Sequence, residues 1–377
     1  MSTRFRIGVD GRAFRSPAGG VRRYVGEIYR RLAEMDDVRV TAIGATDRDD
    51  LPAGIVRRPA IPFPTNLGWS ALSLPLAASG AGIDVFHAPA YTAPLWGVHP
   101  QAVTIHDVSY ERVPEWNAYK NDAARRWFYR RSALAADQVI TDSEFSRREI
   151  AEAYEIDPAR IAVVPLAAAE MFTPGPFNPP RVPAGVRRPY VLHVGDVQIR
   201  RNLTTALGAI LRVRELGRSL TAADTTSGTG LVCAGVDRGV GASLTAQAQA
   251  ANDPGAIVLT GPVSDAELLN LYRGASLFVY PSRYEGFGLP ILEAMQCGLP
   301  VVAADSSSIP EVVGDAGLLI DPLDVEAWTA AMEGILSHPA RAAVMRHASI
   351  KRAAAFSWDR TAHETLAALR ACAGTGA

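Results

Sequence analysis

Two glutamates separated by seven residues enclose the stretch of this chain that is best suited to chemistry. Glu285 lies in a loop with two glycines, and Glu293 lies one turn into a helix that we expect to begin at Leu289 and Pro290. Unpaired N–H groups at a helix start attract anions, so a phosphate suits this position, with the carboxylates accepting hydrogen bonds from sugar hydroxyls on either side. Acidic residues in a first turn are more often simply solvated. The glycine loop favours the functional interpretation, because it permits close backbone approach.

Adjacent arginines follow the expected strand Tyr190–Val194. Arg200 and Arg201 lie in the loop after Gly195, where they are well placed to meet a diphosphate, which guanidinium groups bind bidentately. The alternative is an exposed basic pair at a helix start. The helix dipole disfavours positive charge there, so we favour the diphosphate interpretation.

The first half of the chain repeats the pattern of strand, glycine loop and helix. Gly19 and Gly20 precede a helix expected over 21–35, and they indicate either a backbone approach to a phosphate or sugar, or a plain helix start. Further along, His106 and Asp107 end the expected strand 102–106. Open α/β sheets gather their ligands beyond the carboxyl ends of strands, so both residues are candidates for a site.

Large aromatic side chains surround the second of these positions. Tyr91, Tyr110, Trp116 and Tyr119 lie in the flanking loops, where they could stack on sugar rings or pack half-buried. Both interpretations stay open for these residues.

Metal and disulfide chemistry have little support. Asp47 and Asp49 form a D-x-D pattern, but no further ligand cluster accompanies it, so a solvated loop is favoured. The three cysteines are widely spaced and form no C-x-x-C, which indicates a reducing cytoplasm.

Composition is that of an ordinary globular protein of 377 residues with a formal net charge of −1, so bulk electrostatics do not favour nucleic acid binding. The first residues lack the apolar segment of a signal peptide, and no apolar run approaches the roughly 18 residues needed to span a bilayer. A helix expected over 121–136 carries Arg125, Arg126, Arg130 and Arg131. It predicts either a peripheral contact with anionic lipid or a core-facing helix with a solvated rim.

The order of elements predicts two α/β domains. Strands and helices alternate over 1–172 and again over 190–356, separated by a proline-rich linker at 173–189. Such alternation indicates parallel sheets covered on both faces, with a cleft between the domains. G-x-G-x-x-G, P-loop and G-x-S-x-G motifs are absent, which removes support for dehydrogenase, P-loop and serine hydrolase functions.

Taken together, these stretches resemble the family 4 retaining glycosyltransferases of the GT-B fold. The most specific match is the E-x7-E signature from Glu285 to Glu293, continuing into Gly298–Val302. The other matching segments are Gly19-Gly20, Asp84–His87, His106-Asp107, Ser143–Ser146, Ser308–Val312 and Phe356–Trp358. The resemblance implies two doubly wound, Rossmann-like domains facing across a cleft. It assigns the acceptor to the N-terminal domain and the nucleotide-sugar to the C-terminal domain, with 357–377 crossing back as a final helix.

The resemblance also implies roles for single residues. Glu293 would bind the ribose hydroxyls, and His106 would hydrogen-bond the transferred sugar. Gly20 would approach the diphosphate. Glu285, with the backbone of Phe287, Gly288 and Leu289, would hold the donor sugar and phosphates. Many family members carry arginine and lysine at the positions of Asp196 and Arg201, so whether Arg200 or Arg201 meets the diphosphate stays open.

The expected function is hexosyl transfer, in the EC 2.4 class, from a nucleotide-diphosphate sugar to a glycan or lipid-linked acceptor in polysaccharide biosynthesis. GDP-mannose is the first guess for the donor. The resemblance implies same-face displacement with retention and no requirement for a metal or cofactor. The alternatives are a non-catalytic sugar-nucleotide-binding protein and a nucleotide-sugar epimerase on the same fold. A cytoplasmic location is expected, with a possible peripheral position at the inner membrane face.

Overall fold

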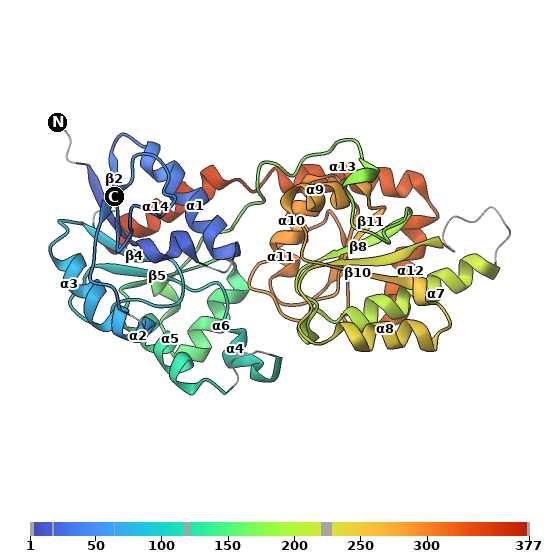
Figure 1. Cartoon of the computed structure of the whole chain (residues 1–377), viewed down its shortest axis with the longest axis horizontal. Helices are drawn as coiled ribbons and strands as arrows, with labels where there is room; N and C mark the ends of the chain where they lie inside the picture. The colour runs from blue at the N-terminus through green and yellow to red at the C-terminus, as the bar shows by residue number, and fades with distance from the viewer. Residues whose placement is uncertain (1–3, 17–18, 64, 117–120, 220–227, 375–377) are drawn as a thin grey trace. The chain divides into compact units, whose positions relative to one another are not determined.

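The computed structural model describes residues 4–16, 19–63, 65–116, 121–219 and 228–374 (Figure 1). The chain divides into two compact units: residues 1–166 with 357–377, and residues 167–356. The predicted final segment at 357–377 therefore belongs to the first unit. The predicted linker at 173–189 lies within the second unit.

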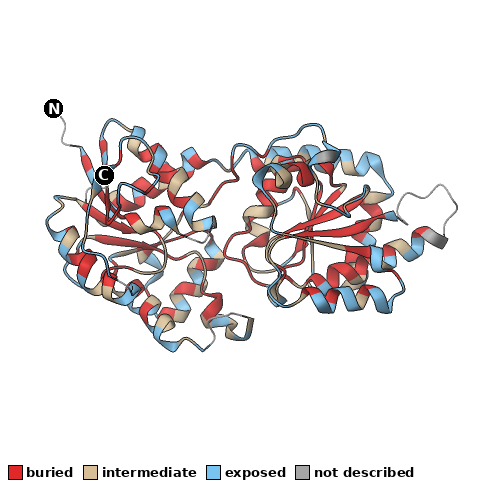
Figure 2. Cartoon of the chain, viewed as in Figure 1, coloured by how far each residue is buried: buried red, intermediate tan, exposed pale blue. Residues whose placement is uncertain are grey.

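The first unit is built on a seven-stranded parallel sheet in the order β3-β2-β1-β4-β5-β6-β7. Its strands are β1 Phe5–Asp10, β2 Val38–Ile43, β3 Val56–Arg58, β4 Val85–Ala88, β5 Gln101–Thr104, β6 Gln138–Thr141 and β7 Ile161–Val163. Its helices are α1 Gly19–Glu34, α2 Asn66–Gly68, α3 Leu74–Ser79, α4 Ser109–Arg112, α5 Ala123–Ala135, α6 Glu144–Tyr154 and α14 Trp358–Cys372. Strands β4 and β5 are buried along their whole length, as expected for a parallel sheet covered on both faces (Figure 2).

The second unit has a six-stranded parallel sheet in the order β10-β9-β8-β11-β12-β13. Its strands are β8 Tyr190–Val194, β9 Gly230–Ala234, β10 Ile257–Gly261, β11 Leu277–Tyr280, β12 Val301–Ala304 and β13 Leu318–Ile320. Its helices are α7 Leu203–Ser219, α8 Gly241–Ala250, α9 Asp265–Gly274, α10 Leu289–Gln296, α11 Ile309–Val313, α12 Val325–Leu336 and α13 Pro339–Ala353. Figure 1 shows helices on both faces of this sheet, which confirms the predicted doubly wound fold class.

The last helix, α14, is fixed within the first unit by polar contacts at both ends. Asp359 at its start accepts from Arg31 of α1 at 2.5 Å, and Arg370 near its end donates to Asp37 at 2.6 Å. Between these contacts the helix buries an apolar face that includes Leu366 and Leu369. Apolar burial supplies the main stabilisation, and the two ion pairs fix the position of the helix along α1.

The proline-rich segment packs against the second unit rather than running free. Asn178 and Asn270 of α9 exchange hydrogen bonds of 2.7 and 2.6 Å, and Arg273 donates to the carbonyl of Thr173 at 2.9 Å. Prolines remove backbone donors, so side chains of α9 supply the hydrogen bonds that this segment cannot make with itself.

Candidate active site

The strand order of the second unit reverses between β8 and β11. At such a switch point the connections leave in opposite directions, and a crevice opens beyond the carboxyl ends of the two strands. Arg201 follows β8, in the short turn Ile199–Arg201, and Glu285 follows β11. The two residues are 84 positions apart in sequence, and topology brings them to the same edge of the sheet. Both side chains are buried.

Glu285 and Arg201 form a buried ion pair through Oε1 and Nη1. Ser282 Oγ donates to the same carboxylate at 2.5 Å, and Arg201 Nη1 also donates to the hydroxyl of Tyr280. Arg201 Nε is buried and has no partner within the described part of the chain. The guanidinium therefore keeps an unused donor beside a carboxylate, which suits a ligand with both an anionic group and hydroxyls.

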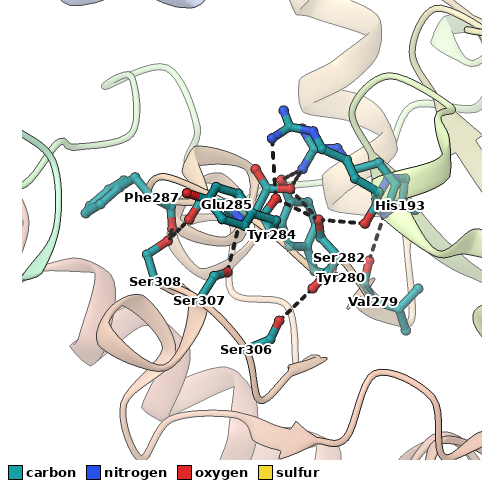
Figure 3. A network of polar contacts seen from close by, with 12 residues as sticks. His193, Val279, Tyr280, Ser282, Tyr284, Glu285, Phe287, Ser306, Ser307 and Ser308 are labelled. Carbon is teal, nitrogen blue, oxygen red and sulfur yellow. Dashed lines mark hydrogen bonds and ion pairs between the residues drawn. The ribbon is translucent and has the colours of Figure 1, made fainter. Parts of the chain in front are cut away.

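Three consecutive serines hold the loop that carries Glu285. Ser307 Oγ accepts from the Glu285 amide at 3.0 Å, and Ser306 Oγ donates to the Ser282 carbonyl at 2.9 Å (Figure 3). Ser308 Oγ lies 2.9 and 3.0 Å from the carbonyls of Glu285 and Phe287. In the sequence, Ser308 and Glu311 form a capping-box pattern, which predicts a helix start at this point. The helix α11 does begin at Ile309, but the predicted cap is wrong, because the Ser308 side chain does not cap α11. The Ser308 hydroxyl instead donates to loop carbonyls. A buried carbonyl without a donor costs more free energy than an accessible helix end, which water can hydrogen-bond.

Gly288 is the residue at which the loop becomes α10. Its φ of 109° and ψ of 48° are positive-φ backbone angles that favour glycine, and α10 begins at Leu289 with Pro290 in its first turn, as predicted. The N-terminus of α10 has no side-chain cap. The positive end of this helix therefore remains without a side-chain acceptor, as an anion site at that position requires.

Glu293 lies on the buried side of α10, and Tyr272 of α9 donates to it at 2.8 Å. Burial, followed by the charge of Glu293, raises the pKa of Tyr272 well above its usual range, so this hydroxyl stays a donor. Glu293 is thus held in one orientation from within the unit. Its assignment to the ribose stays a prediction.

Arg200 and Asp196 occupy different surroundings from Arg201. Arg200 is half-buried and donates to the carbonyl of Tyr284 at 3.3 Å, whereas Asp196 pairs with Arg238 at 3.0 Å. Arg201 forms an ion pair with Glu285. This geometry favours Arg201 over Arg200 as the residue that meets a diphosphate.

His193 of β8 was missed by the sequence analysis. It is fully buried, stacks on Tyr280 with ring centroids 5.4 Å apart, and donates from Nδ1 to the carbonyl of Val279 at 3.2 Å. Burial lowers its pKa to about 3, so the ring is neutral and acts as a rigid support beneath the hydroxyl that contacts Arg201. No pattern in the sequence distinguishes it from other residues of the strand.

In the first unit the strand order reverses between β1 and β4. A pocket of about 350 Å³ lies at this switch point, lined among others by Asp10, Arg12, Asn66 and Pro89. Arg12 pairs with Asp10 at 3.1 Å and lies 4.4 Å from the centre of a Trp69 ring. None of these residues was among the predicted site residues. For Asp10 and Arg12, the available signal was their position at the end of the first strand.

Gly19 and Gly20 form the start of α1. A Cβ atom built on Gly20 would meet no protein atom within 4 Å. The space beside this helix start is therefore open, and packing inside the unit does not require glycine at this position.

His106 follows β5, and its Nδ1 lies 2.8 Å from Oδ2 of Asp142, which follows β6. Nε2 of His106 is buried and has no partner among the residues that the structure describes. Burial opposes the charged ring, but the neighbouring Asp142 outweighs it and raises the pKa of His106 above its ordinary value of 6.5. Asp142 fixes the tautomer and leaves Nε2 available for a ligand. Asp142 was also missed, although it directly follows strand β6.

The predicted aromatic residues differ in their surroundings. Tyr91, with a φ of 55°, lies edge-on to His106 and stacks on Tyr129 at a centroid distance of 5.1 Å. Tyr110 is buried in the core, with its hydroxyl 2.7 Å from that of Tyr154. Trp116 is half-buried at the end of a short turn. Tyr119 lies outside the described residues. Of this group, Tyr91 is the ring that is both beside His106 and partly accessible.

The remaining candidates are largely paired within the first unit. Asp49 of the D-x-D pattern is buried and pairs with Arg15 at 2.9 Å. Among the residues described, no cluster of three or more His, Cys, Asp or Glu side chains is arranged to hold a metal ion. In α5, Arg125, Arg126 and Arg130 form ion pairs with Asp122, Glu111 and Glu155, respectively. Over the same described ranges, no helix combines the length and apolar character required to cross a bilayer.

Two protein families match this chain. Residues 18–168 match the family described as Glycosyltransferase Family 4, and residues 188–338 match Glycosyl transferases group 1. O-antigen chain mannosyltransferase B of Escherichia coli is 31% identical over 296 residues, which cover 76% of this chain and 74% of that protein. D-inositol 3-phosphate glycosyltransferase of Mycobacterium marinum is 33% identical over 249 residues, or 63% of this chain and 51% of the relative. This chain thus matches about half the length of the second relative.

Solved structures show the same fold at low sequence identity. Sucrose-phosphate synthase from Thermosynechococcus elongatus superposes with a TM-score of 0.71 at 20% identity, covering 96% of this chain and 97% of that one. Anabaena Alr3699/HepE, solved in complex with UDP and glucose, gives a TM-score of 0.69 at 17% identity, covering 98% and 100%.

Fold and comparisons together define a glycosyltransferase enzyme of the GT-B class. Within this class, the chain belongs to glycosyltransferase family 4. The predicted family and enzyme class are confirmed.

Proposed function

We propose that the chain is a retaining hexosyltransferase that moves a hexose from a nucleotide-diphosphate sugar to a glycan or lipid-linked acceptor. Mannose carried by GDP is the first choice of donor. The observation that carries the proposal is the buried Arg201–Glu285 pair at the switch point of the second unit, with an unused guanidinium donor on one side. The name of the Escherichia coli relative supports mannose and a role in polysaccharide biosynthesis.

Breaking the bond between the sugar and the diphosphate develops negative charge on the leaving group and positive charge on the sugar. Arg201 and the uncapped start of α10 supply fixed positive groups for the leaving diphosphate. Glu285 accepts hydrogen bonds from sugar hydroxyls, and Nε2 of His106 bonds the transferred sugar. In the proposed same-face displacement, the acceptor oxygen bonds to the anomeric carbon as the phosphate departs. The acceptor proton passes to that phosphate, so no protein base is required.

Fixed positive groups in this scheme take the place that a divalent cation would otherwise fill, so we propose transfer without a metal or other cofactor. We also propose a cytoplasmic location with a peripheral contact at the inner membrane face through α5. Three of its arginines are ion-paired, which leaves Arg131 as the exposed arginine that has no described partner.

An assay of donor turnover separates this proposal from its alternatives. The chain is incubated with UDP-, GDP- and dTDP-hexoses, with and without a glycan or lipid-linked acceptor, and nucleoside diphosphate release is measured. We expect acceptor-dependent release that is unchanged by EDTA, and a product that keeps the anomeric configuration by proton NMR. An epimerase would convert the donor without acceptor, a non-catalytic binder would release nothing, and an inverted product would contradict the retaining mechanism.

A further inference from the structure

A row of charged side chains crosses the sheet of the first unit near the start of its strands. Arg6 of β1 and Arg39 of β2 are register partners, so their side chains leave the same face of neighbouring strands about 4.8 Å apart. Arg6 is neutralised by Asp84, with Nη2 and Oδ1 2.5 Å apart. Arg39 is exposed, and its side chain makes no hydrogen bond or ion pair with any described residue. Its positive charge is therefore uncompensated within the described part of the unit, which favours an anion beside it.

Two further arginines come from the edge strand β3. Arg57 and Arg58 of β3 join Arg6 and Arg39 in lining a pocket of about 470 Å³, which we call the arginine pocket. Arg57 donates to the carbonyl of Asp49 at 3.0 Å, and Arg58 donates to that of Ala77 at 2.9 Å. A carbonyl positions a guanidinium without neutralising it. None of the described residues that line the pocket is acidic.

The loop on the other side of the arginine pocket is shaped by glycine. A Cβ atom on Gly80 would lie 2.9 Å from Nη2 of Arg58, so a larger residue there would displace the guanidinium. Gly82 lines the pocket and has a φ of 60°, in the left-handed region that favours glycine. Both glycines thus preserve space next to the arginines.

We propose that the arginine pocket binds the phosphate group of a phosphorylated organic ligand distinct from the sugar donor. Arg39, Arg57 and Arg58 have no carboxylate partner among the described residues, and planar guanidinium groups bind phosphate oxygens bidentately. The volume lies within the usual range for small-molecule sites and exceeds what a bare phosphate needs. Val56, Pro59 and Ala81 provide apolar walls for the organic part of the ligand. The pocket belongs to the first unit, whereas the Arg201–Glu285 pair belongs to the second.

The phosphate has two possible sources, a soluble phosphate ester and a phospholipid headgroup. Residues 59–83, whose two ends line the arginine pocket, contain no charged side chain. They expose Ile61 at 73% and Leu76 at 62% of their surface. A membrane surface would accept both the apolar side chains and the arginines, so the test includes lipid as a separate arm.

The test uses the full chain, an Arg39→Gln variant and an Arg148→Gln control. Arg148 is also an exposed arginine of the first unit, on α6, and its side chain has no partner among the described residues. The soluble arm titrates glycerol 3-phosphate by calorimetry. The lipid arm measures flotation with vesicles of phosphatidylcholine, with and without phosphatidylglycerol. Unfolding midpoints show that both variants fold.

We expect Arg39→Gln to weaken binding at least tenfold in one arm, with Arg148→Gln within twofold of the unmodified chain. Loss in the calorimetric arm identifies a soluble ester, and loss in the flotation arm alone identifies a lipid headgroup. Absence of binding in both arms would overturn the proposal. Equal losses in the two variants would also overturn it, because the effect would then reflect general positive charge.

Discussion

The two candidate sites of this molecule, around Glu285 in the second unit and around His106 in the first, are built in different ways. In the second unit, Glu285 is held by Ser282, Ser307 and Ser308, which lie within 23 residues of it, and only Arg201 comes from a distant loop. In the first unit, His106 depends on Asp142 and on the rings of Tyr24 and Tyr91, which come from three separate parts of the chain. A contiguous segment builds a rigid site that a short motif reveals. A site built from dispersed residues leaves no comparable pattern.

The largest effect is expected at the centre of the contiguous site. Glu285→Gln removes the charge that compensates Arg201 and that accepts from the donor sugar. We expect transfer to fall about 10²- to 10³-fold, the range typical for loss of one preorganised electrostatic contact. Initial rates with saturating donor measure this effect.

Glu326→Gln is the matched control, because this glutamate lies in the same unit with a side chain 86% exposed. We expect it to transfer within twofold of the unmodified chain. Full activity in Glu285→Gln, with an unchanged unfolding midpoint, would remove Glu285 from the site.

A smaller effect is expected in the dispersed site, from Asp142→Asn. The substitution removes a charge-assisted hydrogen bond with a net value of about 1.5–3 kcal/mol, so we expect a loss of transfer of roughly ten- to a hundredfold.

The pKa of His106 shows whether Asp142 acts on the ring by its charge, because a purely structural role of Asp142 would leave this pKa unchanged. With Asp142 the pKa lies above 6.5, so the stability contributed by the charged ring is complete below pH 6.5 and is lost as the pH rises through the folded pKa. In Asp142→Asn only the charge of Asp107 still opposes burial, which is the largest influence on the ring, so the pKa of His106 should fall. NMR titration of the imidazole Cε1 proton measures both values. An unchanged pKa would show that Asp142 does not tune His106.

Most of the fold was predictable because parallel strands are continuous apolar runs. The strand Tyr190–Val194 lies at the predicted residues, and the strand expected over 102–106 is found at Gln101–Thr104. The edge strands Val56–Arg58 and Leu318–Ile320 were missed, since each has three residues and neither is fully buried. The helix start at Leu289 followed from glycine and proline chemistry.

Candidate residues in the site were predictable where local sequence encodes them. Glu285 and Arg201 were selected from their loops, but their ion pair depends on strands β8 and β11 lying side by side. Asp142 and His193 were not selected, because a single acidic or imidazole side chain near a strand has no distinctive spacing. The role of Ser308 was misjudged for the same reason: the capping pattern is local, whereas the carbonyls that it serves lie more than 20 residues away.

A moderate effect is expected from the scaffold of the contiguous site. Ser308→Ala leaves the carbonyls of Glu285 and Phe287 without their hydroxyl donor, so we expect a loss of about 1–3 kcal/mol in unfolding free energy. Donor affinity should fall in parallel, because the loop that positions Glu285 loosens. Urea denaturation measures the first effect. Ser337→Ala, an exposed serine after α12, is the control. Equal stability in both variants would show that the hydroxyl does not hold the loop.

The smallest effect on folding is expected at Gly20. A methyl group there meets no protein atom within 4 Å, and alanine is the better helix former, so Gly20→Ala should leave the unfolding midpoint unchanged or slightly raised. Donor affinity should nevertheless fall if the diphosphate approaches this position. Calorimetric titration of the donor tests this, and an unchanged affinity would remove Gly20 from the proposed donor contacts.

The central claim, that the Arg201–Glu285 pair binds a nucleotide-sugar, is tested most directly by a thermal-shift panel of UDP-, GDP- and dTDP-hexoses. A ligand that binds only the native state raises its stability, by about 2.7 kcal/mol at a concentration 100 times its Kd. We predict that one nucleotide-sugar, with GDP-mannose as first choice, raises the unfolding midpoint of the unmodified chain and fails to raise that of Glu285→Gln. A midpoint that no nucleotide-sugar shifts, or one that shifts equally in both proteins, would contradict the account.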